Sequence, residues 1–331
     1  MDYVMFGNTG MEVSRLCLGT MTFGAELDRD ASARVLDEAM DHGVNFLDTA
    51  DSYGESEALL GELLTGRRER LYVATKVYRQ FCRDKRVGRN SRTNIIHALE
   101  RSLRRLKTDY VDLYQLHHPD ARTPVMETMR TLDTLVRQGK IRYVGVSNHY
   151  AWQIAYMLGE AQARGLEPVV SLQAHYSLVD RQIETESVPL CRRFNLALMC
   201  YSPLSGGVLT GKYHAPDGST PQTSKRRRGM IRRLVDDAVI ARVIARMQEL
   251  SRQTGWGMNQ LAMGWLLAQP HATTVILGGS KPEHFSQVYE IADQRLDDSM
   301  VAELAELSAP RVYSKFLNQP TVAGSPLAAQ R

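Results

Sequence analysis

Short apolar runs alternate with longer amphipathic stretches along the whole chain, and this alternation limits the possible folds more than any other feature. Most short runs are apolar at consecutive positions, which is typical of strands buried on both faces of a parallel sheet. The strand-like runs lie at 16–19, 45–47, 71–76, 111–115, 141–146, 169–173, 196–200 and 274–277. The helical stretches lie at 29–42, 57–64, 93–106, 124–138, 150–164, 185–194, 235–254 and 282–291. Eight such units predict an α/β fold, a closed (β/α)8 TIM barrel, rather than an open doubly wound sheet.

Three segments of the 331 residues fall outside this alternation. Residues 3–6 and 12–14, joined across a Gly-Asn-Thr-Gly turn, predict an N-terminal β-hairpin. Residues 211–231 are rich in Gly, Pro, Ser, Thr and Arg without periodicity, which is typical of a long functional loop. No amphipathic period follows Pro310. We therefore expect one domain over residues 1–331, with a C-terminal tail over about 311–331.

The composition narrows the classes of function. Hydrophobic residues make up 43% and charged residues 24%, as in an ordinary folded soluble protein, and the net charge of +4 is too small to indicate nucleic-acid binding. The N-terminus lacks a basic segment followed by an apolar run, and no apolar stretch approaches the roughly 20 residues of a membrane span. We expect a cytoplasmic protein with no membrane or nucleic-acid partner. The four cysteines are widely scattered and indicate neither disulfides nor zinc: Cys17, Cys82, Cys191 and Cys200.

Four polar residues follow successive strand-like runs: Asp48, Tyr53, Lys76 and His117. In a barrel, the carboxyl ends of the strands meet at one mouth, so these side chains are expected to converge. A Tyr with a pKa near 10 is a poor acid at pH 7, but a neighbouring ammonium lowers that pKa, and an Asp keeps the ammonium charged. A His can then orient a substrate oxygen or share the proton. The set predicts a proton-transfer site.

Each of these residues also has an ordinary structural interpretation. Asp48 is a possible helix N-cap, Tyr53 an interfacial aromatic, Lys76 a solvated strand end and His117 a hydrogen-bonded histidine under a loop. Their common position at strand ends favours the functional interpretation. We expect no metal site, because His117 and His118 are predicted to point apart and no carboxylate completes a ligand set.

Two other motifs are set aside. Tyr72 and Lys76 have the Y-x-x-x-K spacing of short-chain dehydrogenases, which requires a helix. Here the run is strand-like, which separates the two residues by about 13 Å. No G-x-G-x-x-G follows the first strand, so a Rossmann domain is not predicted.

Seven motifs follow one another along the chain: FLDTADSYGESEALLG at 46–61, ATK at 74–76, DLYQLH at 112–117, GVSNH at 145–149, SLQ at 171–173, YSPLSGGVLTGKY at 201–213 and VILGGSKPEHF at 275–285. In this order they resemble the motifs of the aldo-keto reductases. The resemblance extends over about residues 3–310 and is strongest for the branch that holds potassium-channel β subunits and bacterial sugar- or aldehyde-type reductases.

The resemblance implies a barrel that binds NADP(H) across its mouth and reduces an aldehyde or ketone to an alcohol by hydride transfer. Tyr53 would be the general acid, Lys76 and Asp48 its tuning pair, and His117 the group that orients the substrate. Tyr201 would stack on the nicotinamide ring, which suits a flat aromatic side chain. The other residues implied near the nicotinamide end are Gly19, Thr20, Met21, Asp48, Ser147, Asn148 and Gln173.

The phosphates and the adenosine are assigned to two Gly-containing segments. The pyrophosphate would lie along Ser202, Pro203, Leu204, Ser205 and Gly206, with Lys212 nearby. Gly278, Ser280 and Lys281 precede an expected helix, whose N-terminus attracts phosphate, and favour NADP over NAD. The chain departs from the family pattern at three positions that concern only the adenosine: His284, Gln287 and Val288.

A basic run at 225–228, with Arg232 and Arg233, lies in the expected long loop. One interpretation is a clamp in which Arg226 reaches the pyrophosphate, since this loop can cover the dinucleotide in the family. A solvated run of charges and a nucleic-acid contact are the alternatives.

The substrate is expected to be a small carbonyl compound, such as an aldehyde, a cyclic ketone or an oxidised sugar. Candidate pocket residues are Met21, Phe23, Tyr78, His118 and Tyr150. The alternative function is that of a redox-sensing or regulatory subunit, which would hold NADP(H) with little turnover. The complete set of four polar residues argues against it. The sequence leaves the oligomeric state open.

Overall fold

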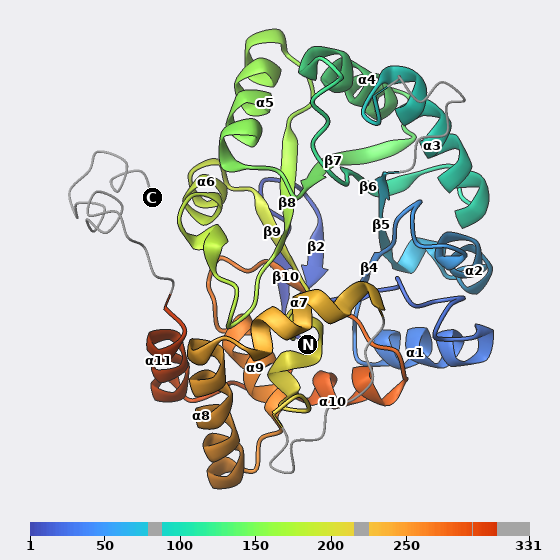
Figure 1. The fold of residues 1–331 in the computed structure, drawn as a ribbon. Coiled ribbons are helices and arrows are strands. Elements are labelled where there is room, and N and C mark those ends of the chain that lie inside the picture. The colour runs from blue at the N-terminus through green and yellow to red at the C-terminus, as the bar shows by residue number, and fades with distance from the viewer. Residues whose placement is uncertain (79–87, 215–224, 293, 310–331) are drawn as a thin grey trace.

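A computed structural model describes residues 1–78, 88–214, 225–292 and 294–309. Eight parallel strands close into a barrel in chain order, with the last strand pairing the first (Figure 1). The strands are β3 (Leu16–Gly19), β4 (Phe46–Asp48), β5 (Tyr72–Val77), β6 (Val111–Leu116), β7 (Ile141–Ser147), β8 (Val169–His175), β9 (Ala197–Tyr201) and β10 (Thr274–Leu277). The predicted (β/α)8 barrel is confirmed.

Helices surround the barrel and bury apolar side chains in the main core, some of them against neighbouring helices rather than against the strands (Figure 1). Two of them begin at predictable N-caps, since Asp28 accepts a hydrogen bond from the backbone of Ala31 and Ser91 accepts one from that of Asn94. The α-helices up to β9 are α1 (Arg29–Asp41), α2 (Ser56–Leu63), α3 (Arg92–Leu106), α4 (Val125–Arg137), α5 (Ala151–Arg164) and α6 (Ser187–Phe194). Those after β9 are α7 (Lys225–Val235), α8 (Ala238–Thr254), α9 (Met258–Leu267), α10 (Glu283–Ala292) and α11 (Asp298–Leu307). Three short 3-10 turns complete the set: η1 (Arg68–Arg70), η2 (Gln182–Glu184) and η3 (Ser205–Thr210).

The expected loop at 211–231 requires a correction. Its second half is helical, because α7 begins at Lys225, and only residues 211–214 of the first half are described. Ile231 is buried and Leu234 and Val235 are half-buried, a helical spacing that the surrounding arginines obscure in the sequence. α7 packs on η3 and α8. The expected tail at 311–331 lies outside the described residues.

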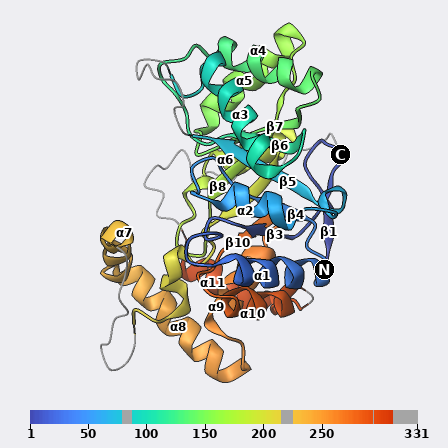
Figure 2. The ribbon, with the colours of Figure 1, turned by 90° about the vertical axis from the view of Figure 1, so that its right-hand side faces the viewer.

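The predicted hairpin is present as β1 (Tyr3–Met5) and β2 (Glu12–Ser14). It closes the amino-terminal end of the barrel, opposite the side on which α7 lies (Figure 2). Phe6 and Val13 are fully buried there and pack with Cys17 and Phe46 in a cluster separate from the main core. The carboxyl ends of the strands therefore form the open mouth.

No helix in the described part of the chain is long and apolar enough to cross a lipid bilayer.

Candidate active site

Strand register brings polar residues of four strands together near the mouth as a layer made of two register pairs, which are offset because Gln115 is level with Gly145, two residues before Ser147. Lys76 on β5 is level with Gln115 on β6, and Ser147 on β7 is level with Gln173 on β8. All four are buried. Gly145 allows this layer to form, because a Cβ atom there would lie 2.5 Å from the hydroxyl of Ser171 and 3.0 Å from Cγ of Gln115.

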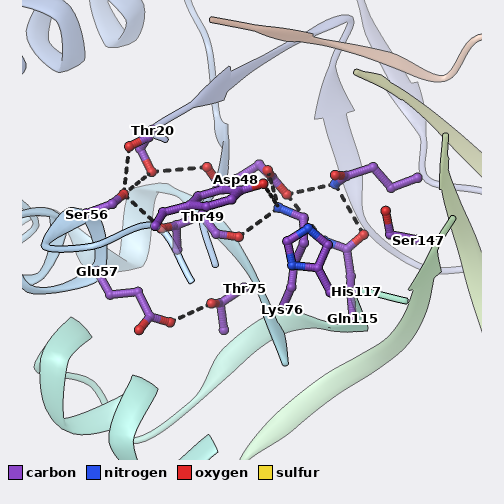
Figure 3. Close-up of polar contacts among 12 residues, drawn as sticks. Thr20, Asp48, Thr49, Ser56, Glu57, Thr75, Lys76, Gln115, His117 and Ser147 are labelled. Atoms are coloured by element: carbon purple, nitrogen blue, oxygen red, sulfur yellow. Dashed lines mark hydrogen bonds and ion pairs between the residues drawn. The ribbon is translucent and has the colours of Figure 1, made fainter. Parts of the chain in front are cut away.

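Lys76 is the centre of the site (Figure 3). Its ammonium donates to Oδ2 of Asp48 at 2.6 Å, to the carbonyl oxygen of Thr49 at 2.8 Å and to the hydroxyl of Tyr53 at 3.3 Å. Burial opposes the charge of Lys76, but its attraction to Asp48 and Tyr53 outweighs burial and raises its pKa. The ammonium is therefore charged beside the Tyr53 hydroxyl. Three of the four predicted residues thus meet in one hydrogen-bonded group.

His117, the fourth, lies next to this group (Figure 3). Its ring packs edge-on against Tyr53 with 5.8 Å between the centroids. Burial, the charge of Lys76 and then His118 lower its pKa to about 3, so the imidazole is neutral at pH 7. Its Nδ1 is buried without a hydrogen-bond partner among the described residues. The expectation that His117 and His118 point apart is wrong, because their rings stack with 5.1 Å between centroids.

Two side-chain amides that hold Asp48 extend the predicted site. Gln173 donates to Oδ1 of Asp48 at 2.8 Å, and Gln115 donates to the same oxygen at 3.2 Å. The sequence analysis missed Gln115, although its position two residues before His117 on a strand places both on one face. Both oxygens of Asp48 are therefore occupied, which fixes the carboxylate beneath Lys76.

Asn148 joins the ends of three strands. Its amide donates to the carbonyl oxygen of His117 and to the hydroxyl of Ser147, both at 3.0 Å, and its Oδ1 accepts from the Tyr201 hydroxyl at 2.8 Å. Its φ of 59° lies in the left-handed region that Asn tolerates. The Tyr201 ring stacks on His175 at 5.4 Å, which leaves its other face for a second planar group.

The loop after β9 has a backbone suited to an anion. Ser202, Ser205 and Gly206 adopt φ values of 54°, 47° and 68°, and such left-handed turns present backbone N–H groups to one side. The Ser205 hydroxyl is engaged by Ser177 at 2.8 Å. In the same segment Pro203 is buried and Leu204 is half-buried.

Two lysines approach the start of α10. Lys212, which follows η3, and Lys281, in the turn after β10, are both exposed. Burial and then the charges of these two lysines lower the pKa of His284. Ser280 donates its backbone N–H to Nδ1 of His284 at 3.4 Å. Two cations and a helix N-terminus are the chemistry that binds phosphate.

Some of the remaining residues expected to bind the cofactor are exposed, and others are buried and in contact with other parts of the protein. Met21 is 43% exposed and Gly278 is also exposed. Thr20 is fully buried, and its hydroxyl bonds to the hydroxyl of Ser56 and to the backbone carbonyl oxygen of Asp48. A Cβ at Gly19 would lie 2.6 Å from the carbonyl oxygen of Leu277.

Two of the positions assigned to the adenosine contact other parts of the protein. Gln287 accepts a hydrogen bond from Asn259, and Val288 is buried in the core. Arg226 belongs to α7, but its side chain lies outside the described residues.

The candidate pocket residues separate in the same way. Tyr150 is 67% exposed and Tyr78 is half-buried beside His117. Phe23 is fully buried and packs in the main core, so the expectation that it lines an open pocket is not supported.

Comparison with known proteins places this geometry in a family. The model of the Aldo/keto reductase family matches residues 15–309. The chain belongs to the aldo/keto reductase family. Members are oxidoreductases that act on small molecules and typically use NAD(P)H.

The relatives include a protein named as an oxidoreductase and one named as a probable channel subunit. The uncharacterized oxidoreductase YrpG of Bacillus subtilis is 35% identical over 321 residues, which cover 93% of this chain and 96% of YrpG. A probable voltage-gated potassium channel subunit beta of Oryza sativa is 35% identical, and the match covers 96% of this chain and 95% of that protein. Protein tas of Escherichia coli is 32% identical, and the match covers 95% of this chain and 99% of protein tas.

Proposed function

We propose that this protein is an NADPH-dependent reductase of small aldehydes or ketones, in which Tyr53 is the proton donor. The observation that carries the proposal is the buried Lys76 ammonium, held by Asp48 at 2.6 Å and lying 3.3 Å from the Tyr53 hydroxyl beside an uncharged His117. A structural ion pair would not require a phenol and a neutral imidazole at the same strand ends.

The chain's own groups divide the work. Tyr53 donates its proton to the substrate oxygen, and the Lys76 ammonium stabilises the negative charge that develops on the phenol oxygen. Asp48, fixed by Gln115 and Gln173, keeps Lys76 charged and in place. The neutral His117 orients the substrate oxygen by hydrogen bonding without competing as an acid. When bound, the dihydronicotinamide supplies the hydride to the carbonyl carbon.

The residues present suit an extended dinucleotide. Tyr201 has one ring face free of His175 for the nicotinamide, and Asn148 holds its hydroxyl. The left-handed turn at Ser202 to Gly206 suits the pyrophosphate. Lys212 and Lys281 at the start of α10 support the choice of NADP(H), since a 2′-phosphate adds about two negative charges to the adenosine.

The test is the loss of NADPH absorbance with a panel of aldehydes, diketones and keto-sugars, with NADH in parallel. We expect turnover with a lower KM for NADPH than for NADH. Tyr53→Phe should lower kcat by about a hundredfold or more, since general acid catalysis contributes about 10² to 10⁴. NADPH binding, followed by fluorescence titration, should change little, because the lost hydroxyl does not hold the cofactor.

Full turnover by Tyr53→Phe would exclude Tyr53 as the donor. Tight NADPH binding without turnover on any carbonyl of the panel would favour a redox-sensing subunit. That alternative agrees with the name of the Oryza sativa relative.

A further inference from the structure

A stack of side chains beside His117 ends in an arginine. The Tyr78 ring packs against His117 at 5.3 Å and against His118 at 5.1 Å between centroids. The guanidinium of Arg89 lies over the Tyr78 ring, 4.7 Å from its centroid. Tyr78 directly follows β5 and His117 directly follows β6, so the stack lies at the carboxyl ends of these strands, beside His117.

The backbone that carries Arg89 is fixed rather than loosely exposed. Asp120 accepts a hydrogen bond from the backbone of Asn90 at 3.0 Å, and the Asn90 amide donates to the carbonyl oxygen of His118 at 3.1 Å. Asn94 donates to the carbonyl oxygen of Arg89 itself at 2.7 Å. Gly88 is so close to Asp120 that a Cβ atom would lie 2.4 Å from its carboxylate. These hydrogen bonds fix the backbone of residues 88–90, and with it the position from which the Arg89 side chain reaches Tyr78.

Among the described residues on this side of the mouth, Arg89 carries a charge without an ion pair. Lys76 is neutralised by Asp48, and His117 is uncharged. The ion pairs among the described residues include none with Arg89, and Asp120 is held by hydrogen bonds and by the charge of Arg122 instead. Burial, and then the charge of Arg89, lowers the pKa of His118, whose ring packs on Tyr78.

We propose that Arg89 selects carbonyl substrates that carry a carboxylate away from the reacting carbonyl group. The inference rests on the reductase function proposed above. The planar guanidinium can bind a carboxylate through two parallel hydrogen bonds while it remains stacked on Tyr78. Tyr78 fixes the plane of the guanidinium, which lowers the conformational entropy lost on binding.

The test compares two aldehydes of similar size, 4-carboxybenzaldehyde and the uncharged 4-nitrobenzaldehyde, in the full-length protein with NADPH. Arg89→Gln should raise KM for the carboxylate substrate about fivefold to tenfold, as expected for one partly solvated charge pair. KM for 4-nitrobenzaldehyde should stay within twofold. The KM of Arg89→Lys for 4-carboxybenzaldehyde should lie between those of the wild type and Arg89→Gln, because lysine keeps the charge but cannot form the two parallel hydrogen bonds of a guanidinium.

Two controls separate local binding from general effects. Arg130→Gln removes the same charge from the exposed surface of α4 and should leave both KM values unchanged. Added salt should raise KM for 4-carboxybenzaldehyde in the wild type more than in Arg89→Gln, since exposed charges are screened.

The outcomes distinguish the two proposals. Equal effects of Arg89→Gln on both aldehydes, or no effect on either, would overturn the role of Arg89 while Tyr53-dependent turnover still supports the reductase. No Tyr53-dependent turnover on either aldehyde would overturn the reductase and this inference together.

Discussion

His117 is held uncharged in a place where protonation costs free energy. Its pKa of about 3 in the folded protein lies below the ordinary value of 6.5, because of burial and the nearby charge of Lys76. Below about pH 6.5 the unfolded chain takes up a proton at this residue that the folded protein refuses. Stability is therefore present above pH 6.5 and lost as the pH falls towards 3.

We expect this one histidine to remove about 2 kcal/mol of the free energy of unfolding between pH 7 and pH 5. His117→Gln should lose less stability over that interval than the wild type, as measured by urea denaturation at both pH values. His97→Gln, at an exposed position of α3, is the matched control and should follow the wild type. If His117→Gln and wild type lose the same free energy, His117 is not the neutral group described above.

At the same scale, the sequence predicts ionisable residues at or near strand ends better than neutral amides there. Asp48, Lys76 and His117 could be found because a barrel collects the residues at its strand ends. Gln115 could not be singled out, since a glutamine in an otherwise apolar strand indicates no partner by itself. Its contact with Asp48 depends on the register between β4, β5 and β6, which only the structure supplies.

Among the elements, β7 carries a glycine that the active site requires. A Cβ at Gly145 would press on Gln115 and Ser171, and Gln115 in turn holds Asp48. We expect Gly145→Ala to lower the free energy of unfolding by about 1 to 3 kcal/mol, as overpacking does, and to lower kcat. Thermal denaturation and steady-state kinetics measure the two effects.

Gly159→Ala in α5 is the matched control for this change. A Cβ there meets nothing within 4 Å, so the free energy of unfolding should rise by up to about 1 kcal/mol. Its kcat should not change. If Gly145→Ala is as stable and active as the wild type, the polar layer accommodates the methyl group. The position of Gln115 beside Asp48 would then not be required for activity.

The regular βα units, including α8 and α10, were predictable as elements, whereas α7, α9 and α11 were not. The eight strands agree with the sequence to within two residues at each end, because buried parallel strands are short and apolar throughout. α9 is buried along Leu261–Leu266 without a polar face, so helical periodicity gives no signal there. In α7 the apolar stripe is short and surrounded by arginines.

Across the whole molecule, stability and chemistry occupy opposite ends of the barrel. The hairpin lies at one end of the barrel (Figure 2), and the cluster around Phe6 packs with it. Lys76 and His117 lie at the carboxyl ends of β5 and β6. Phe6 is fully buried and packs edge-on against Phe46 at 5.4 Å, so removing its ring leaves a cavity at the closed end only.

We therefore expect Phe6→Ala to lower the free energy of unfolding by about 3 to 5 kcal/mol while the folded enzyme keeps its kcat. Met5→Ala, at a neighbouring side chain that is 54% exposed, should change the free energy by less than about 0.5 kcal/mol. Urea denaturation and kinetics at 25 °C, corrected for the folded fraction, test both. A fall in kcat beyond that fraction would show that the closed end positions the active site, because the strands between them would then transmit the repacking to Asp48 and Lys76.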